Sequence, residues 1–161
     1  AITTTCGFLV LLQKELQAAT KVPVITSSLM LLPKLLAAQP RVGVLTISAT
    51  RLGKEHLRAA GVPRERLGDV VVQGVDPKGE FATRILGNQP ELDLALARAD
   101  VVAAAAALKA REPSLTDVVL ECTNMPPYRA DVEAATGLKT WCLLDDERLF
   151  RPFKAAASGS P

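Results

Sequence analysis

Residues 118–129 read VVLECTNMPPYR, and this stretch decides how the rest of the sequence is interpreted. An apolar, β-branched run, which is typical of a buried strand, leads directly into Cys122. Two prolines follow, and proline suits the first turn of a helix because the amides there have no partner inside the helix. The stretch therefore predicts a thiol between the carboxyl end of a strand and a helix, where α/β proteins commonly hold their sites.

Segments with strand and helix character alternate along the rest of the chain. This alternation predicts an α/β fold in which parallel strands are flanked by helices. We expect strands at residues 2–5, 22–26, 41–46, 69–75, 117–121 and 138–144, and helices at 7–20, 28–38, 50–60, 90–111 and 127–136, with a last helix starting within 147–154.

The pattern around Cys122 occurs a second time near the start of the chain. CGFLVLLQKELQAAT, at residues 6–20, and CTNMPPYRADVEAAT, at residues 122–136, both begin with cysteine and end with Ala-Ala-Thr without a gap. A β-prone run precedes each cysteine, and another follows each expected helix. The repeat predicts two pseudosymmetric lobes of similar architecture.

The two expected lobes differ in length. We expect residues 40–144 to form the second lobe and residues 1–39 with 145–161 to form the first. Only five residues then precede Cys6 in its lobe. Because parallel strands are normally flanked and covered on both sides, we expect the first lobe to be incomplete and to lack its amino-terminal part.

Composition narrows the functional class. Of the 161 residues 48% are hydrophobic, which allows a sizeable core, and the net charge is only +2. Six aromatic residues and no basic cluster argue against a nucleic-acid surface. The longest apolar runs fall far short of the roughly 20 residues of a membrane-spanning helix. Three widely spaced cysteines do not suggest zinc or a disulfide scaffold, and they favour a reducing cytoplasm.

Three segments together resemble the aspartate/glutamate/hydantoin racemase superfamily: TTTCGF, RVGVLTISAT and VVLECTNMPPYR. The resemblance extends to about residue 144 and rests mainly on the ordered pair of cysteines. It implies two α/β lobes with a substrate pocket between them, catalysis by Cys6 and Cys122, and no cofactor. Glutamate racemases carry His two positions after the second cysteine and usually Asn after the first. Asn124 and Gly7 stand there in this sequence, which weakens a glutamate-specific interpretation.

The chemistry of the two thiols supports this interpretation. One thiolate can remove the α-proton of a carbon acid while a thiol on the opposite face delivers another. Each cysteine precedes an expected helix, whose amino terminus lowers the pKa of a thiol and can bind a carboxylate. We expect Cys142 to be a core residue and His56 to lie on a solvated face. The residues expected to bind substrate beside the two thiols are Thr5, Gly7, Phe8, Thr46, Thr123 and Asn124.

The expected function is that of a cofactor-independent racemase or epimerase, an isomerase that acts on a small carboxylate-bearing substrate such as an amino acid or hydantoin. One alternative from the same superfamily is a decarboxylase or cis–trans isomerase of a malonate- or maleate-like diacid, although such decarboxylases need one cysteine. Another is a truncated, non-catalytic remnant that binds a ligand. The expected partners are a small carboxylate and a second copy in a homodimer, with no metal, nucleic acid or membrane.

Overall fold

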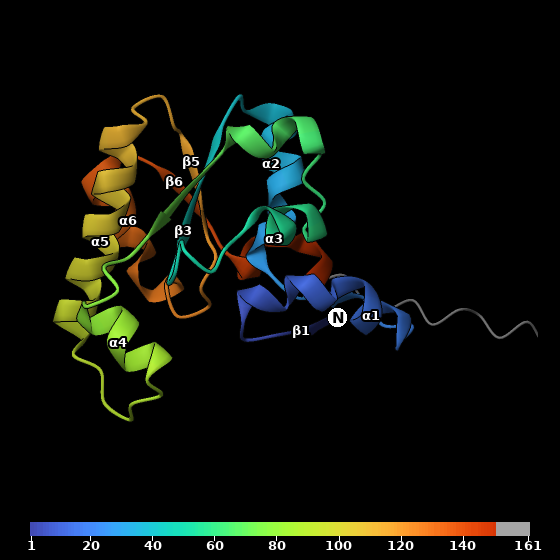
Figure 1. The fold of residues 1–161 in the computed structure, drawn as a ribbon, viewed down its shortest axis with the longest axis horizontal. Coiled ribbons are helices and arrows are strands. Elements are labelled where there is room, and N and C mark those ends of the chain that lie inside the picture. Colours follow the sequence, from blue (N-terminus) through green and yellow to red (C-terminus); the bar gives the residue numbers. More distant parts are fainter. Residues whose placement is uncertain (151–161) are drawn as a thin grey trace, which may run out of the picture.

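Four parallel strands form the central sheet in the computed structural model, which describes residues 1–150 (Figure 1). They are β3 (Val42–Thr46), β4 (Val70–Gly74), β5 (Asp117–Leu120) and β6 (Lys139–Trp141), in the order β4-β3-β5-β6. Every residue of β3 and β5 is buried. The continuous apolar runs of these strands follow from their central position, because both faces of a parallel sheet are covered.

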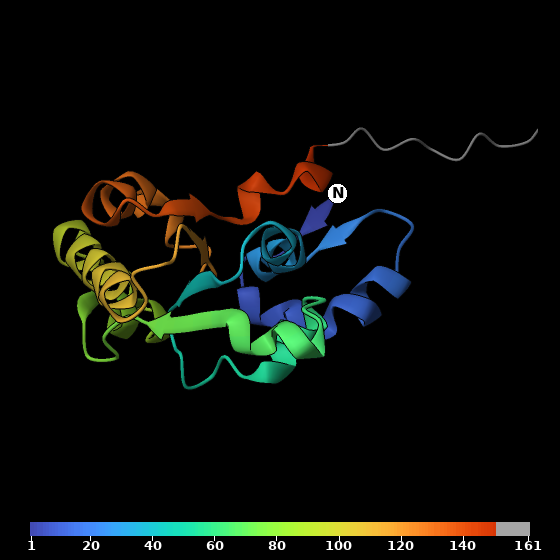
Figure 2. The ribbon, with the colours of Figure 1, turned by 90° about the horizontal axis from the view of Figure 1, so that it is seen from above.

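Helices cover both faces of this sheet (Figures 1 and 2). One face is covered by α4 (Glu80–Leu86), α5 (Leu94–Arg111) and α6 (Arg129–Thr136), and the other by α2 (Leu32–Ala38) and α3 (Lys54–Ala59). The α/β fold with parallel strands flanked by helices, as predicted from the sequence, is confirmed.

The side chains of β5 show that the sheet separates two apolar cores. Val118 and Leu120 point into the core beneath α5, whereas Val119 points into the core beneath α2 and α3. Successive side chains of a strand point to opposite faces of the sheet, so one apolar strand supplies both cores. This double burial holds the carboxyl end of β5, where Cys122 follows, in a fixed position.

The amino-terminal residues form a second, smaller sheet. Its strands β1 (Ile2–Thr3) and β2 (Val24–Ile25) pair in parallel, and within residues 1–150 no strand pairs with the other edge of β1. The Gln13 side chain donates to the Val24 carbonyl oxygen and accepts from the Thr26 amide, which fixes the helical segment against β2. The division into two lobes and the missing part of the first lobe stay predictions.

Several expected helices begin differently in the structure, because their first residues form a 3-10 helix. The helix expected at 7–20 begins as the 3-10 helix η1 (Gly7–Leu12), and only then becomes α1 (Gln13–Ala18). The helix expected at 127–136 likewise begins with η4 (Pro126–Tyr128) before α6. The remaining 3-10 segments are η2 (Ser28–Leu31), η3 (Arg64–Asp69), η5 (Leu143–Asp145) and η6 (Glu147–Leu149).

Three other boundaries were wrong. The helix expected from residue 90 starts at Leu94, because the Asp93 side chain accepts hydrogen bonds from the first free amides. The helix expected from residue 50 starts only at Lys54. The strand expected to reach residue 144 ends at Trp141, after which the chain turns into η5. Residues 151–154 of the last expected helix and the tail at 155–161 lie outside the described residues.

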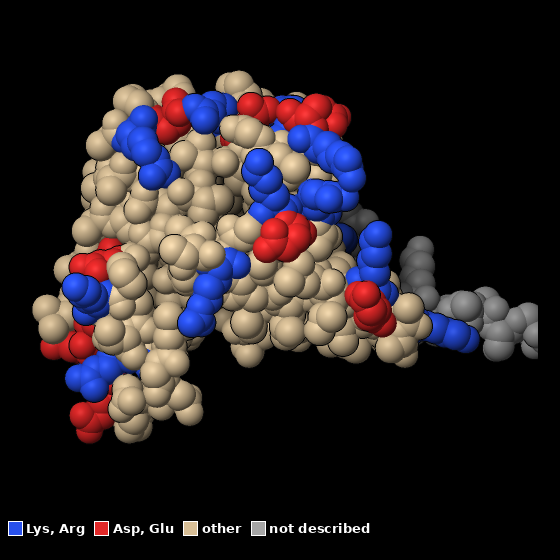
Figure 3. Space-filling view, in the orientation of Figure 1, with Lys and Arg blue, Asp and Glu red and all other residues tan. Residues whose placement is uncertain are grey.

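Two surface properties bear on function. Between residues 1 and 150 no helix is both long and apolar enough to cross a membrane. On the face shown in Figure 3, acidic and basic side chains are interspersed, with broad uncharged areas between them. This face therefore presents no extended field of one sign that would attract a polyanion.

Candidate active site

A cavity of about 120 Å³ lies at the carboxyl end of the central sheet. It is bordered by the start of η1 with the two residues before it, by the residues that follow β3 and β5, and by the end of α4. The Glu121 amide extends the strand pairing by donating a 2.8 Å hydrogen bond to the Leu45 carbonyl oxygen of β3. The residues that line the cavity are Thr5, Cys6, Gly7, Phe8, Ile47, Ile85, Leu86, Glu121, Cys122, Thr123 and Asn124.

The fold brings Cys6 and Cys122 to this one cavity. Cys6 is exposed and stands at the amino terminus of η1, where its carbonyl oxygen accepts a 3.1 Å hydrogen bond from the Leu9 amide. Cys122 is buried and follows β5, separated from the strand by Glu121 alone. The two segments are joined by a hydrogen bond of 2.6 Å from the Thr123 hydroxyl to the Thr5 carbonyl oxygen. Two thiols therefore border a single small space.

The pKa of Cys122 is raised to about 11. Burial is the main cause, and the neighbouring charges of Glu121 and Cys6 act in the same direction, whereas hydrogen bonds from Asn124 lower the pKa. The prediction that the amino terminus of a helix lowers the pKa is wrong for this thiol. The helical turn starts only at Pro126, so its dipole does not begin at the sulfur, and the sulfur is buried.

Glu121 lines the cavity, although the sequence did not assign it to the catalytic or substrate-binding residues. Its side chain is 1% exposed, and burial raises its pKa to about 7, although a hydrogen bond from Thr46 lowers it. The Thr46 hydroxyl donates to Glu121 Oε2 at 2.8 Å. Oε1 has no hydrogen-bond partner among residues 1–150. A glutamate placed directly after an apolar strand and next to Cys122 was the available signal.

The positions of two other residues also require correction. Thr46 was expected to bind substrate, but it is fully buried behind Glu121 and is not part of the cavity wall. His56 was expected on a solvated face, but only 5% of it is exposed. Its ring packs edge-on against the ring of Phe8, with 5.3 Å between centroids, and supports this wall of the cavity. Both residues are buried by contacts with distant segments.

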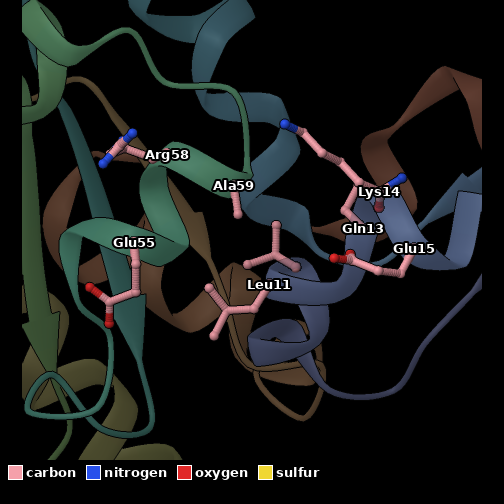
Figure 4. Close-up of a pocket in the computed structure, with 8 residues that line it drawn as sticks. Leu11, Gln13, Lys14, Glu15, Glu55, Arg58 and Ala59 are labelled. Carbon is pink, nitrogen blue, oxygen red and sulfur yellow. The ribbon is translucent and has the colours of Figure 1, made fainter.

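A larger crevice of about 310 Å³ lies between α3 and the segment formed by η1 and α1. Figure 4 shows Glu55 and Arg58 on the α3 side and Lys14 and Glu15 on the α1 side. These charged side chains are solvated, and no thiol reaches the crevice. Residues 1–150 also contain no group of three or more His, Cys, Asp or Glu side chains arranged to hold a metal ion. The thiol-lined cavity is therefore the candidate active site.

Comparison with known proteins gives two similar curated sequences. The chain is 35% identical over 146 residues to a dimethylsulfoniopropionate lyase of Durusdinium sp. clade D, which covers 87% of this chain and 48% of the relative. It is 33% identical over 142 residues to dimethylsulfoniopropionate lyase 5 of Emiliania huxleyi (strain CCMP1516), covering 79% of this chain and 26% of the relative. The chain thus spans about half the length of the first relative. No family model matches it.

Comparison with solved structures gives a glutamate racemase from Francisella tularensis subsp. tularensis SCHU S4 in complex with D-glutamate. The TM-score is 0.53 at 17% sequence identity, and the match covers 87% of this chain and 51% of the racemase. This likeness shows a shared fold. The chain therefore has the aspartate/glutamate racemase fold, in agreement with the resemblance seen in the sequence.

The predicted activity requires correction. Racemase and isomerase chemistry was expected from that resemblance, but the sequence relatives at 33% and 35% identity are named as lyases. The racemase match has about half that identity, and it supports only the fold. Lyase chemistry had been considered solely in the form of a decarboxylase. The error arose because a shared fold and a cysteine pair are compatible with more than one reaction at a carbon next to a carboxylate.

Proposed function

We propose that this chain carries the thiol-lined active site of a lyase that acts on dimethylsulfoniopropionate. The observation that supports this proposal most strongly is the 35% identity to a lyase of that name across 87% of this chain. The candidate site agrees with it, because two thiols and a buried carboxyl group border one small cavity. Descent from the superfamily of the aspartate/glutamate racemases belongs to the same proposal, and it is supported by the common fold.

The substrate has a carboxylate at one end and a dimethylsulfonium group at the other. A base removes a proton from the carbon next to the carboxylate, and the electron pair of that C–H bond forms a C=C bond. The bond between carbon and the sulfonium sulfur breaks, and its electron pair leaves with sulfur. The products are acrylate, neutral dimethyl sulfide and the protonated base, which returns its proton to water. No oxidant or reductant is consumed.

We assign proton removal to the thiolate of Cys122. A carbon next to a carboxylate is a weak acid, so a strong base is needed, and burial makes this thiolate a stronger base than an ordinary one. The Asn124 side chain lies within 3.8 Å of the sulfur and stabilises the thiolate by hydrogen bonding. Elimination removes one proton from one face. A second thiol that delivers a proton is therefore not required, in contrast to racemisation.

The rest of the cavity suits the two ends of this substrate. Phe8, Ile47, Ile85 and Leu86 provide an apolar wall for the methyl groups, and an aromatic ring face attracts a cation. Thr5, Thr123 and Cys6 surround the same space with groups that can form hydrogen bonds. Together with Gly7 and Asn124, these residues form the proposed substrate site.

The proposal is tested by incubating the protein with dimethylsulfoniopropionate and measuring dimethyl sulfide in the gas phase and acrylate by NMR. We expect both products in equal amounts. Cys122→Ser should lower the rate by at least about a hundredfold, because a serine hydroxyl ionises far less readily than a thiol. Cys142→Ala is the matched control, since this third thiol is buried in the core away from the cavity. A folded protein that releases no dimethyl sulfide would contradict the proposal.

A further inference from the structure

The proposed reaction assigns no role to Glu121, whose side chain carries an oxygen without a hydrogen-bond partner in residues 1–150, Oε1. The side chain is 1% exposed, yet within residues 1–150 no donor reaches Oε1. Leaving a buried polar atom unpaired costs about 1–3 kcal/mol. Glu121 is one of the residues that line the cavity, and an unpaired atom beside a cavity indicates a partner that arrives with the ligand.

The position of Oε1 is determined from two sides. Thr46 donates to Oε2 at 2.8 Å and so fixes the orientation of the carboxyl group. On the other side, a Cβ atom added at Gly7 would lie 2.1 Å from Oε1. The oxygen therefore occupies the space that any other side chain at position 7 would fill. Because Gly7 lies between Cys6 and Phe8 in the cavity wall, Oε1 faces the segment that carries the first thiol.

The geometry points to Glu121 as a further catalytic residue that stays a neutral acid and donates a hydrogen bond from Oε1 to the substrate carboxylate. This inference rests on the proposed function for the identity of the substrate. When the α-proton leaves, negative charge gathers on the substrate carboxylate, and the Glu121 hydrogen bond strengthens as it does so. Glu121 donates a hydrogen bond and passes no proton to the substrate, so the atom and electron balance of the elimination is unchanged.

Other roles for Glu121 fit the geometry less well. An ionised carboxylate at this position would repel the substrate carboxylate and would be buried without a cation, which is costly. Cys6 and Cys122 are the other titratable groups that line the cavity, and neither supplies positive charge. His56 stands behind Phe8, and its Nδ1 accepts a hydrogen bond from the Gly53 amide at 3.2 Å. Burial favours the neutral acid by raising its pKa to about 7, so the carboxyl group is mostly protonated below that pH.

The test is a comparison of the wild-type protein with Glu121→Gln. A glutamine keeps the shape, can accept from Thr46 and can donate through its amide nitrogen, but it cannot ionise. Binding of propionate, a carboxylate without a leaving group, is measured by calorimetry at pH 6 and pH 8. We expect wild-type affinity to fall about tenfold over this interval, as Glu121 ionises near pH 7, whereas Glu121→Gln should change less than about threefold. Glu91→Gln, at an exposed site, should behave like the wild type.

Activity provides the second readout. If dimethyl sulfide is released, kcat/KM of the wild type should bend near pH 7, and the bend should be absent in Glu121→Gln. Retained activity of Glu121→Gln at pH 6 would show that residue 121 acts as a hydrogen-bond donor and not as a base, because an amide cannot accept a proton. Loss of activity at every pH in a folded Glu121→Gln protein would overturn the inference, as would equal pH dependence of propionate binding in both proteins.

Each failure has a distinct signature. Propionate binding with the expected pH dependence but without dimethyl sulfide release would refute the lyase and leave the carboxylate role of Glu121 standing. If Glu121→Gln does not fold, the inference is tested by infrared spectroscopy of the wild-type protein. The band of a protonated carboxyl group must shift when propionate is added at pH 6. An unchanged band at saturating propionate would overturn the inference.

Discussion

The hydroxyl of Thr123 donates a 2.6 Å hydrogen bond to the backbone carbonyl oxygen of Thr5. These residues directly adjoin the two cavity thiols, Thr5 before Cys6 and Thr123 after Cys122, although they are 118 positions apart in the chain. The Thr123 side chain thus connects the amino-terminal segment to the residues that follow β5, next to a second hydrogen bond of 2.8 Å from the Ser28 hydroxyl to the Leu120 carbonyl oxygen. The hydrogen bond from Thr123 to Thr5 holds together the two segments that carry the cavity thiols.

Replacing Thr123 by valine keeps its shape and removes this hydrogen bond. We expect kcat for dimethyl sulfide release to fall about tenfold, because a misplaced catalytic group lowers the rate steeply. Thermal stability should change little, since a partly exposed hydrogen bond contributes only about 1 kcal/mol. Thr83→Val is the control, because Thr83 bonds within α4 and does not line the cavity. Equal kcat in both variants would show that the connection has no catalytic role.

The three cysteines should differ in reactivity. Cys6 is exposed, whereas Cys122 is buried and burial raises the pKa of its thiol. Because only the thiolate is alkylated, we expect iodoacetamide at pH 7 to modify Cys6 at least about tenfold faster than Cys122. Cys142 should react only after unfolding, as it is 1% exposed. Peptide mass spectrometry after timed alkylation measures the three rates, and a faster reaction at Cys122 would contradict the burial argument.

Gly7→Ala should damage the site. The added methyl group would lie 2.1 Å from Glu121 Oε1 and 2.7 Å from the Glu121 carbonyl oxygen, and the backbone atom cannot rotate away. We expect a loss of about 1–3 kcal/mol in the free energy of unfolding together with a marked loss of activity. Gly68→Ala is the matched control, because a Cβ atom there meets nothing within 4 Å. Urea unfolding and dimethyl sulfide release measure both effects; equal results for the two variants would refute the clash.

The stability of the protein should depend on pH through Glu121. Burial raises the pKa of this group from 4.5 to about 7, so the folded state binds the proton more tightly than the unfolded state. The stabilising contribution is complete below pH 4.5 and is lost as the pH rises through 7. The shift of about 2.5 units, from 4.5 to 7, corresponds to about 3 kcal/mol.

Urea unfolding of the wild type and of Glu121→Gln at pH 4.5 and pH 8 measures this contribution. The stability difference between the two proteins should change by about 3 kcal/mol over that interval, in favour of Glu121→Gln at the higher pH. Glu91→Gln controls for the loss of a carboxylate at an exposed position. Parallel pH dependences of all three proteins would show that Glu121 titrates normally.

The sequence by itself determined the fold class and the identity of the candidate thiols. Strand and helix alternation is encoded in local periodicity, and the repeated cysteine pattern pointed to Cys6 and Cys122 before any geometry was known. The C-terminal cap at Gly137, with φ of +68°, also follows from local sequence, because glycine adopts this conformation readily. The choice between racemase and lyase needed similar sequences, since a shared fold does not specify the reaction.

Only the tertiary structure decided the environment of the site. Glu121, Thr46 and His56 are polar residues that local pattern assigns equally well to the surface, yet all three are buried by segments distant in the chain. The raised pKa of Cys122 has the same origin, since burial outweighs the hydrogen bonds from its neighbour Asn124. Periodicity reflects the hydrogen bonding of nearby residues, whereas burial and pKa depend on contacts such as that between Thr46 and Glu121, 75 positions apart.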